Sequence, residues 1–272
     1  MTLSLVYDII NHHYKKGGIT MRSVIVLDTE TISIDKPFCY NVGWVILDID
    51  AGSVIDQHDY VVEQHWHNTA LFSTAYYANK RPLYVSAMRG KRATMDKWGY
   101  IMRDLANDIR KYNAEAVFAF NSPFDDKVIE FNCEWFRTIN PLDNIPVLDI
   151  RGMVSEFITN TSDYTDFCEE HKLLTEKGHY STNAENVYRY IMNKVDFEEA
   201  HTALADALIE TDIMITCRSL GADLFKEYKV LQYIPRYEIK PFKIKVDGEI
   251  VYEGEYRKKY VHDGLYSFHT KA

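Results

Sequence analysis

Four carboxylates and one imidazole stand at points where the sequence predicts that a strand ends or a helix begins. Carboxylate oxygens are ligands that Mg²⁺ and Mn²⁺ prefer in proteins, and a histidine with a pKa of ~6.5 can accept a proton near neutral pH. Two such cations about 4 Å apart can hold the attacking and leaving oxygens of a phosphoryl displacement. Side chains of this kind could therefore support hydrolysis of a phosphodiester bond if they converge. They are Asp28, Glu30, Asp125, His201 and Asp206.

The first pair of carboxylates, Asp28 and Glu30, follows the apolar and β-branched run 24–27. Such a run is typical of a strand that is buried on both faces. A spacing of two residues puts both side chains on one face of an extended chain, so both can reach one site. An aspartate that only caps the loop after the strand is the structural alternative for Asp28.

Asp125 lies in the first turn of a predicted helix, directly after a predicted buried strand. A structural explanation also exists here, because Ser122 is a natural N-cap and Pro123 suits the first helical position. Asp125 itself would favour the positive end of the helix dipole. We expect Asp126 and Lys127 to lie on the solvated face of the helix.

The third element is His201 followed five residues later by Asp206, within a run of alanines and leucines. A carboxylate in such a helix is strongly desolvated unless a cation or a polar partner compensates it. Five residues of helix separate two side chains by about 140°, so we expect His201 to precede the helix on a loop. Small alanines would let the helix approach a sheet closely and bring Asp206 near the strand ends.

The composition is that of an ordinary globular protein. The 272 residues carry 31 Lys and Arg against 40 Asp and Glu, a formal net charge of −9, with 46% hydrophobic residues. These proportions exclude disordered, collagen-like and coiled-coil classes. The acidic balance argues only weakly against nucleic acid as a partner, because carboxylates that hold metal ions also make the formal charge negative.

The pattern of apolar residues predicts strands that alternate with helices after an initial meander of three strands. Such an order is typical of an α/β domain with a mixed sheet. Residues 65–92 between them are expected to be irregular, and alternating residues around Asp247-Gly248 predict an appended β-hairpin. The predicted strands are 24–27, 41–49, 53–63, 115–120 and 146–149, and the predicted helices are 95–112, 123–137, 151–157, 163–171, 184–192 and 203–218.

The chain ends are expected to lie outside this domain. Met21 stands directly before a strong strand signal and after Lys-Lys-Gly-Gly, so one hypothesis makes Met21 a natural start and residues 1–20 a dispensable extension. A short N-terminal helix packed on the domain is the alternative. The predicted division is 1–20 for the extension, 21–222 for the main domain and 223–272 for a β-rich appendage.

The three motifs in this order, Asp-x-Glu, a second Asp and His-x4-Asp, resemble those of the DnaQ-like (DEDDh) 3′→5′ exonuclease superfamily. The segment 121–125, Asn-Ser-Pro-Phe-Asp, is similar to the Asn-Ala-x-Phe-Asp of that family. Phe120 stands where a histidine is frequent, and Ser122 replaces alanine. The resemblance covers residues 22 to about 220, and it implies a ribonuclease H-like three-layer fold, in which helices flank a mixed, mostly parallel sheet.

The resemblance also implies roles for the five residues. Asp28 would bridge two Mg²⁺ or Mn²⁺ ions, Glu30 and Asp206 would complete one metal site, and Asp125 would contribute directly or through water. His201 would deprotonate the attacking water. The activity implied is a metal-dependent 3′→5′ exonuclease that releases 5′-nucleotides from single-stranded or frayed DNA.

Two other functions remain open at this point. An RNA or short-oligonucleotide trimming enzyme would use the same ligands, and the contact to the 2′-hydroxyl that separates the two is invisible in the sequence. A catalytically silent nucleic-acid-binding module would usually lack a ligand, and none is missing. The expected partner is a single-stranded 3′ end, and whether a replication protein also binds is open.

The segment 76–92 is the candidate for contacts with nucleic acid, because aromatic and basic side chains alternate along it as in single-strand binders. Its members are Tyr76, Tyr77, Lys80, Arg81, Arg89, Lys91 and Arg92. A second basic stretch, 226–259, has nine Lys and Arg against six Asp and Glu, or +3, in the predicted hairpin. The hairpin could contact nucleic acid, dock to a protein or shield the core.

The cellular setting is inferred from cysteines and hydropathy. No apolar run approaches the ~18 residues that a membrane span requires. The four cysteines lie far apart without a Cys-x-x-Cys pair, so we expect reduced thiols in a cytoplasmic protein that does not associate with membranes.

Overall fold

The computed structural model describes residues 22–231, 234, 237–246, 249–259 and 268–269, and it contains a six-stranded mixed sheet. The strand order is β4-β3-β2-β1-β5-β6. The β1–β2 and β2–β3 pairs are antiparallel, whereas β1–β5, β5–β6 and β3–β4 are parallel. The strands are β1 (Ser23–Thr31), β2 (Cys39–Asp48), β3 (Ser53–Val62), β4 (Thr94–Asp96), β5 (Val117–Ala119) and β6 (Val147–Asp149).

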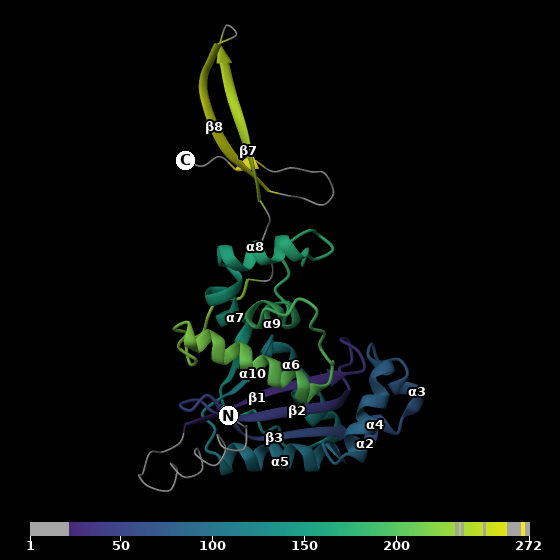
Figure 1. Ribbon diagram of the computed structural model, residues 1–272. Helices are drawn as coiled ribbons and strands as arrows, with labels where there is room; N and C mark the ends of the chain where they lie inside the picture. Colours follow the sequence, from purple (N-terminus) through teal and green to yellow (C-terminus); the bar gives the residue numbers. More distant parts are fainter. Residues whose placement is uncertain (1–21, 232–233, 235–236, 247–248, 260–267, 270–272) are drawn as a thin grey trace.

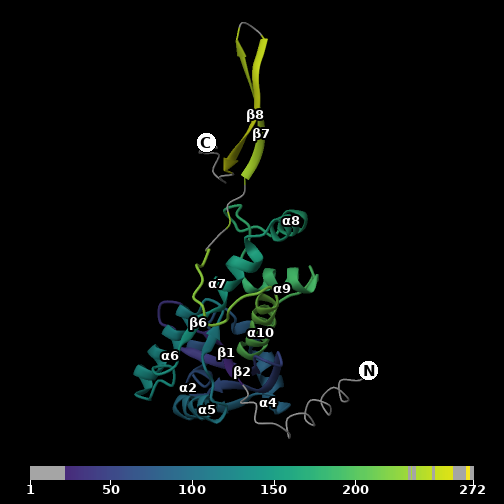
Figure 2. The ribbon, with the colours of Figure 1, turned by 90° about the vertical axis from the view of Figure 1, so that its left-hand side faces the viewer.

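Helices cover both faces of the sheet, as the ribonuclease H-like prediction requires (Figures 1 and 2). Val24 and Val26 of β1 pack into a core with the helices of one face, while Ile25 and Leu27 pack into a second core on the other. This alternation follows from the period of two along a strand. The first face carries α7 (Ile150–Val154), α8 (Ser162–His171), α9 (Ala184–Met192) and α10 (Ala203–Ser219), and the second carries α5 (Trp98–Lys111) and α6 (Ser122–Phe136).

Most predicted elements agree with the structure within a few residues, but the prediction for residues 65–92 was wrong. That segment contains α2 (Glu63–Trp66), α3 (Thr69–Phe72), the 3₁₀ turn η1 (Ala78–Lys80) and α4 (Arg81–Arg89). These short helices bury Trp66, Phe72 and Tyr84 in a small core of their own, which also includes Tyr40 of β2 and Val61 of β3. Helices of one turn show no 3.6-residue periodicity, so the pattern resembled a loop.

Two other boundaries differ from the prediction. The helix expected over 95–112 begins at Trp98, because Thr94–Asp96 form β4 on the edge of the sheet. The helix expected over 151–157 ends at Val154 and continues as a π-helical turn, η2 (Ser155–Thr159).

Helix α10 lies directly on β2 at Gly43. A methyl group on the Gly43 Cα would overlap the backbone of Ala203 and Leu204, so only glycine fits between the strand and the first turn of the helix. Asn41 fixes the same end of the helix, because its Oδ1 accepts a hydrogen bond from the Ala203 N–H at 2.7 Å. The close approach expected of an alanine-containing helix is therefore present, and it depends on Gly43 as well.

We expect Gly43→Ala to reduce the free energy of unfolding by about 2–3 kcal/mol, since the first turn of α10 must move away from the strand. Urea denaturation followed by circular dichroism would measure the change. Gly90→Ala is the control, because Gly90 has a φ of −81° and its new methyl group would come no closer than 3.3 Å to a neighbour, whereas that of Gly43→Ala would overlap the backbone of Leu204. Equal stability of Gly43→Ala and the wild type would contradict the packing described.

The C-terminal hairpin predicted around Asp247-Gly248 is present as β7 (Tyr237–Val246) and β8 (Glu249–Lys259), with β9 (Phe268–His269) paired to β8. Figures 1 and 2 show it beyond α8, away from the six-stranded sheet. The turn 247–248 and the proposed N-terminal extension 1–20 lie outside the described residues. All four cysteines are buried free thiols. Within the described ranges, no helix is long and apolar enough to cross a bilayer.

Candidate active site

The carboxyl end of β1 presents Asp28 and Glu30 on the face of the sheet that α10 covers. Both follow Val24 and Val26 in the alternation of the strand. Glu30 is buried, with 8% of its surface exposed, and its Oε2 accepts a hydrogen bond from the Tyr40 hydroxyl at 3.4 Å. Burial, with a smaller contribution from the nearby charge of Asp28, raises the pKa of Glu30 to about 8.

Asp125 reaches the same strand end from α6. It is 4% exposed, and its Oδ1 accepts a hydrogen bond from the Thr29 hydroxyl at 2.7 Å. The prediction of Ser122 as N-cap was wrong by one residue, because α6 begins at Ser122 and Asn121 is the N-cap with a φ of +71°. The tight turn from β5 into α6 needs this left-handed conformation, which asparagine tolerates better than most residues. Asp125 remains in the first turn, and Asp126 and Lys127 are exposed as expected.

His201 and Asp206 approach from the start of α10. His201 precedes the helix with a φ of +53°, Thr202 is the N-cap, and Asp206 lies in the first turn. The loop position expected for His201 and the helical position expected for Asp206 are thus both found. Asp206 is buried, and its Oδ1 has no hydrogen-bond partner among the described residues.

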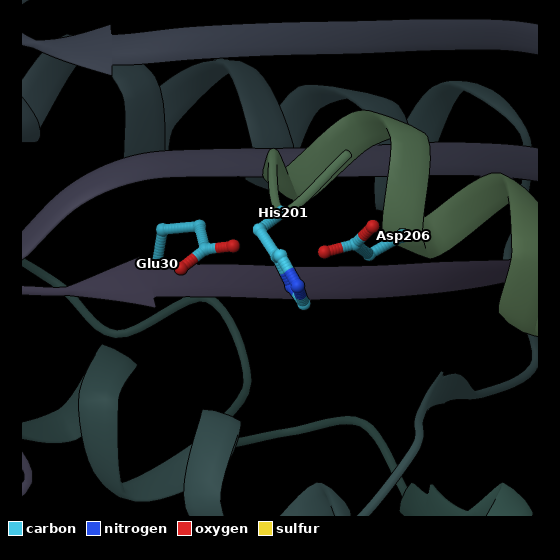
Figure 3. A group of neighbouring side chains, drawn as sticks. All are labelled: Glu30, His201 and Asp206. Atoms are coloured by element: carbon cyan, nitrogen blue, oxygen red, sulfur yellow. The ribbon is translucent and has the colours of Figure 1, made fainter. Parts of the chain in front are cut away.

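These side chains converge. One ligand atom from each of Glu30, His201 and Asp206 lies within 4.8 Å of the others, and Figure 3 shows the two carboxylates on either side of the imidazole. The charge of Asp28 raises the pKa values of Glu30, Asp125 and Asp206, so Asp28 lies near all three. Three of the five residues selected from the sequence thus form one cluster of ligand atoms, and Asp28 and Asp125 lie near it.

Burial and mutual repulsion disfavour the ionised form of these carboxyl groups. Burial is the largest cause in every case, and it raises the pKa of Asp28 to about 7 and that of Asp206 to about 10. The pKa of Asp125 is also raised by burial and by Asp28. Because ionised carboxylates are desolvated here, the folded chain is less stable when they are charged.

A divalent cation fits this arrangement. The buried Asp206 Oδ1 has no partner in the described part of the chain, and the neighbouring ligand atoms are hard carboxylate oxygens and one imidazole nitrogen. Hard oxygen donors favour Mg²⁺ and Mn²⁺ over softer metals. Asp28, Glu30, Asp125 and Asp206 could hold such ions, as the sequence predicted.

Two further acidic residues belong to the site and were missed in the sequence. Glu210 is 4% exposed, one helical turn after Asp206, and its Oε2 accepts a hydrogen bond from the Phe120 N–H at 3.0 Å. Its bond joins α10 to the end of β5 beside Asp125. Glu199 has a pKa raised to about 7 by burial, and its Oε2 lies 3.8 Å from His201 Nδ1. The i, i+4 spacing of two acids in an apolar helix was the available signal for Glu210.

The helical segment 63–92 holds His201 from the other side. The Tyr77 ring stacks on the imidazole with centroids 4.1 Å apart and planes 12° apart. The Tyr84 hydroxyl donates a hydrogen bond to the His201 carbonyl oxygen at 3.3 Å. Burial lowers the pKa of His201, and the positive charge of Lys80 lowers it further.

We expect Tyr77→Ala to raise the pKa of His201 toward its ordinary value, because removing the stacked ring lets water reach the imidazole. Tyr77→Phe keeps the ring and should leave this pKa as it is. A pH titration of the His201 imidazole by NMR, without divalent cations, would measure both. Tyr76→Ala is a matched control, since Tyr76 is 86% exposed and touches Tyr77 but has no ring contact with His201. An unchanged His201 pKa in Tyr77→Ala would contradict this account.

Not every residue of the predicted nucleic-acid segment faces the site. The Arg81 guanidinium lies over the Trp66 ring at 4.2 Å and over the Phe72 ring at 4.8 Å, so Arg81 supports the small core. Tyr77 and Lys80 act on His201 directly, as described above. Lys91 and Arg92 are exposed further along the chain, after α4.

The sequence matches no family model and no curated protein. The fold is similar to the nuclease domain of 3′hExo, a DEDDh family member bound to rAMP, with a TM-score of 0.53 and 13% identity over 77% of this chain and 98% of that one. A 3′-exonuclease solved for its recognition of the histone mRNA stem-loop aligns with a TM-score of 0.50 and 10% identity, over 86% and 91% of the two chains. This likeness shows that the chain has the ribonuclease H-like fold expected from its sequence.

Proposed function

We propose that this chain is a metal-dependent 3′→5′ exonuclease that hydrolyses the terminal phosphodiester bond of single-stranded or frayed DNA and releases 5′-nucleotides. The observation that carries the proposal is the convergence of three buried carboxylates, the half-buried Asp28 and one histidine from three distant segments. Such a set is costly for a fold to bury unless the carboxylates bind cations. We assign the activity to residues 21–222.

Each side chain has a role in the proposed reaction. Asp28, Glu30, Asp125 and Asp206 would together hold the divalent ions. Bound Mg²⁺ or Mn²⁺ supplies Lewis-acid stabilisation of the charge on the attacking and leaving oxygens. His201 accepts the proton of the attacking water, and its lowered pKa keeps the imidazole neutral and able to do so near pH 7.

The positions of Tyr77 and Tyr84 support His201 as the base. The stacked ring fixes the plane of the imidazole, and the hydrogen bond to the His201 carbonyl fixes the backbone in its left-handed conformation. A base that is oriented before the substrate binds loses less entropy during the reaction. Glu199 lies next to Nδ1, where it can stabilise the imidazolium that forms after proton transfer.

The second candidate function is trimming of RNA or short oligonucleotides at the 3′ end. Of the similar folds, one is bound to rAMP and the other recognises an mRNA stem-loop, which favours RNA. A catalytically silent binding module is disfavoured, because none of the proposed ligands is missing from the chain.

The test is incubation of the purified chain with 5′-labelled single-stranded DNA, duplex DNA and RNA, with and without Mg²⁺ or Mn²⁺. We expect a ladder of products shortened from the 3′ end that appears only with the cation, and fastest on single-stranded DNA. A faster rate on RNA would select the second candidate. The absence of shortened products from all three substrates would refute the proposal.

A further inference from the structure

A groove lies between α4 and α10, beside the segment that carries His201. Its volume is about 640 Å³, and its walls come from the two helices, from Gln57 and Asp59 of β3, and from Lys91 and Arg92. We call it the α4–α10 groove. Ala200 and Thr202 also line it, so the groove borders the candidate active site across the backbone of His201. A volume of this size suits a ligand of one or two nucleotides.

The α4–α10 groove carries a net positive charge, because Lys91 and Arg92 outnumber Asp59, the carboxylate in its lining. Lys91 and Arg92 are exposed, and no carboxylate of the described residues lies within the 4 Å of an ion pair with either. Two unpaired cations at one groove are notable in a chain with a formal net charge of −9. Lys and Arg side chains without an acidic partner, placed along a groove, are typical of proteins that bind the phosphates of a single strand.

Asp59 is the acidic residue in the lining, and its charge is partly compensated. Its Oδ1 accepts a hydrogen bond from Asn41 Nδ2 at 2.6 Å, and the charge of Arg92 favours its ionised form. Burial acts in the opposite direction and raises its pKa to about 6. With Lys91 and Arg92 both charged, the groove keeps a net positive charge even when Asp59 is ionised.

Apolar side chains form the remaining wall. Leu204 and Leu208, one helical turn apart on α10, face Leu83 of α4 across the groove, and Leu83 is 45% exposed. A surface that combines apolar walls with cations suits a chain in which bases and phosphates alternate. Lys80 extends the positive charge toward the site, since its charge lowers the pKa values of both Glu30 and His201.

We propose that the α4–α10 groove binds the nucleotides of a single DNA strand on the 5′ side of the bond that is cut. This inference rests on the proposed function, because it takes the 3′ end to lie at the carboxylates. Lys91 and Arg92 contact phosphates, and the leucines contact bases or sugars. The enzyme should therefore prefer a strand that has nucleotides upstream of the cut bond over a substrate that has none.

The first experiment compares two substrates of different length. One is a 5′-labelled DNA 12-mer, and the other is the p-nitrophenyl ester of thymidine 5′-monophosphate, which has no upstream nucleotide. In Lys91→Ala/Arg92→Ala, we expect the ratio of kcat/KM for the 12-mer to that for the ester to fall roughly tenfold, through KM of the 12-mer. The salt dependence of KM should also weaken by about 1.4 logarithmic units per decade, at about 0.7 for each lost phosphate contact.

The matched control is Arg103→Ala/Arg110→Ala, which removes the same charge from α5 on the opposite face of the sheet. It should leave the ratio unchanged. An equal fall of the ratio in both double variants would overturn the inference, because the loss of net charge alone would then explain it. No fall in Lys91→Ala/Arg92→Ala would also overturn it, because these two residues would then make no contact with the strand.

A second experiment separates this inference from the proposed function. Binding of a fluorescent 12-mer is measured by anisotropy in the full chain that carries Asp206→Asn, so that the strand is not consumed. Lys91→Ala/Arg92→Ala should weaken binding roughly tenfold in this background. If the wild type hydrolyses neither substrate while this loss of binding is observed, the hydrolytic function fails and the groove stands. Unchanged binding refutes the groove whatever the hydrolysis shows.

Discussion

Asp206→Asn should reduce hydrolysis of a single-stranded DNA substrate by about 10³-fold or more. The reason is that the buried carboxylate loses the charge with which it would hold a divalent cation, and the cation supplies several kcal/mol of transition-state stabilisation. The same change should make the cation-free protein more stable. A substitution that acted only by damaging the fold would lower both activity and stability, so the opposite signs are diagnostic.

The effect of Asp206→Asn on stability has a sign that follows from the pH dependence of stability. Burial raises the pKa of Asp206 to about 10 from an ordinary value of 3.8, so the folded chain holds a proton that the unfolded chain has released. Stability therefore declines as pH rises through this range, and asparagine removes that contribution. Without divalent cations, we expect the variant to melt at a higher temperature than the wild type, with a difference that grows from pH 4 toward pH 9.

Thermal denaturation with EDTA, and then with Mn²⁺, would measure both effects. Mn²⁺ should raise the melting temperature of the wild type more than that of the variant. Asp212→Asn is the matched control, because Asp212 is exposed on the same helix and makes only a 3.4 Å hydrogen bond with Tyr188. Retained activity in Asp206→Asn, or a lower melting temperature without cations, would contradict the metal-binding role.

His201→Ala is expected to lower kcat by about 10²–10⁴-fold while leaving the affinity for DNA nearly unchanged. This range is the usual contribution of a positioned general base. Because the pKa of His201 is lowered by burial and by Lys80, the acidic limb of the kcat/KM profile should lie below the ordinary histidine pKa of ~6.5. That limb should be absent from the residual activity of the variant.

Steady-state kinetics between pH 5 and 9, together with an anisotropy measurement of DNA binding, would check this expectation. His67→Ala provides the control, since His67 is exposed between α2 and α3. If turnover survives unchanged in His201→Ala, another group is the base, and Glu199 is the nearest alternative at 3.8 Å from the imidazole.

The sequence predicted most of the sheet and its helices because apolar residues mark each element clearly. The run 24–27 specified the central strand, and the alanine-containing pattern specified α10. The five site residues could be selected because each stands next to such a boundary. Their actual convergence depends on strand order and on the fit of α10 against Gly43, and spacing along the chain does not encode either.

The support of His201 could not be predicted, for a physical reason. The segment 63–92 folds around Trp66, Phe72 and Tyr84, and its short helices, of three to nine residues, follow this local core rather than a regular period. Tyr77 and Tyr84 reach His201 only once that core is packed against the sheet. The N-cap of α6 could not be predicted for a similar reason. Ser122 was chosen because serine is a preferred N-cap in an isolated helix, whereas the N-cap is Asn121 because of the tight turn from β5 into α6.

The late position of α10 in the chain has a consequence for protein synthesis. Asp28, Glu30 and Asp125 leave the ribosome well before His201 and Asp206, which arrive with the last helix of the main domain. A nascent chain therefore carries an incomplete set of ligands, and it lacks the proposed base. On the proposed function, an unfinished polypeptide cannot degrade nucleic acid near the translating ribosome, and activity begins only when the completed helix docks.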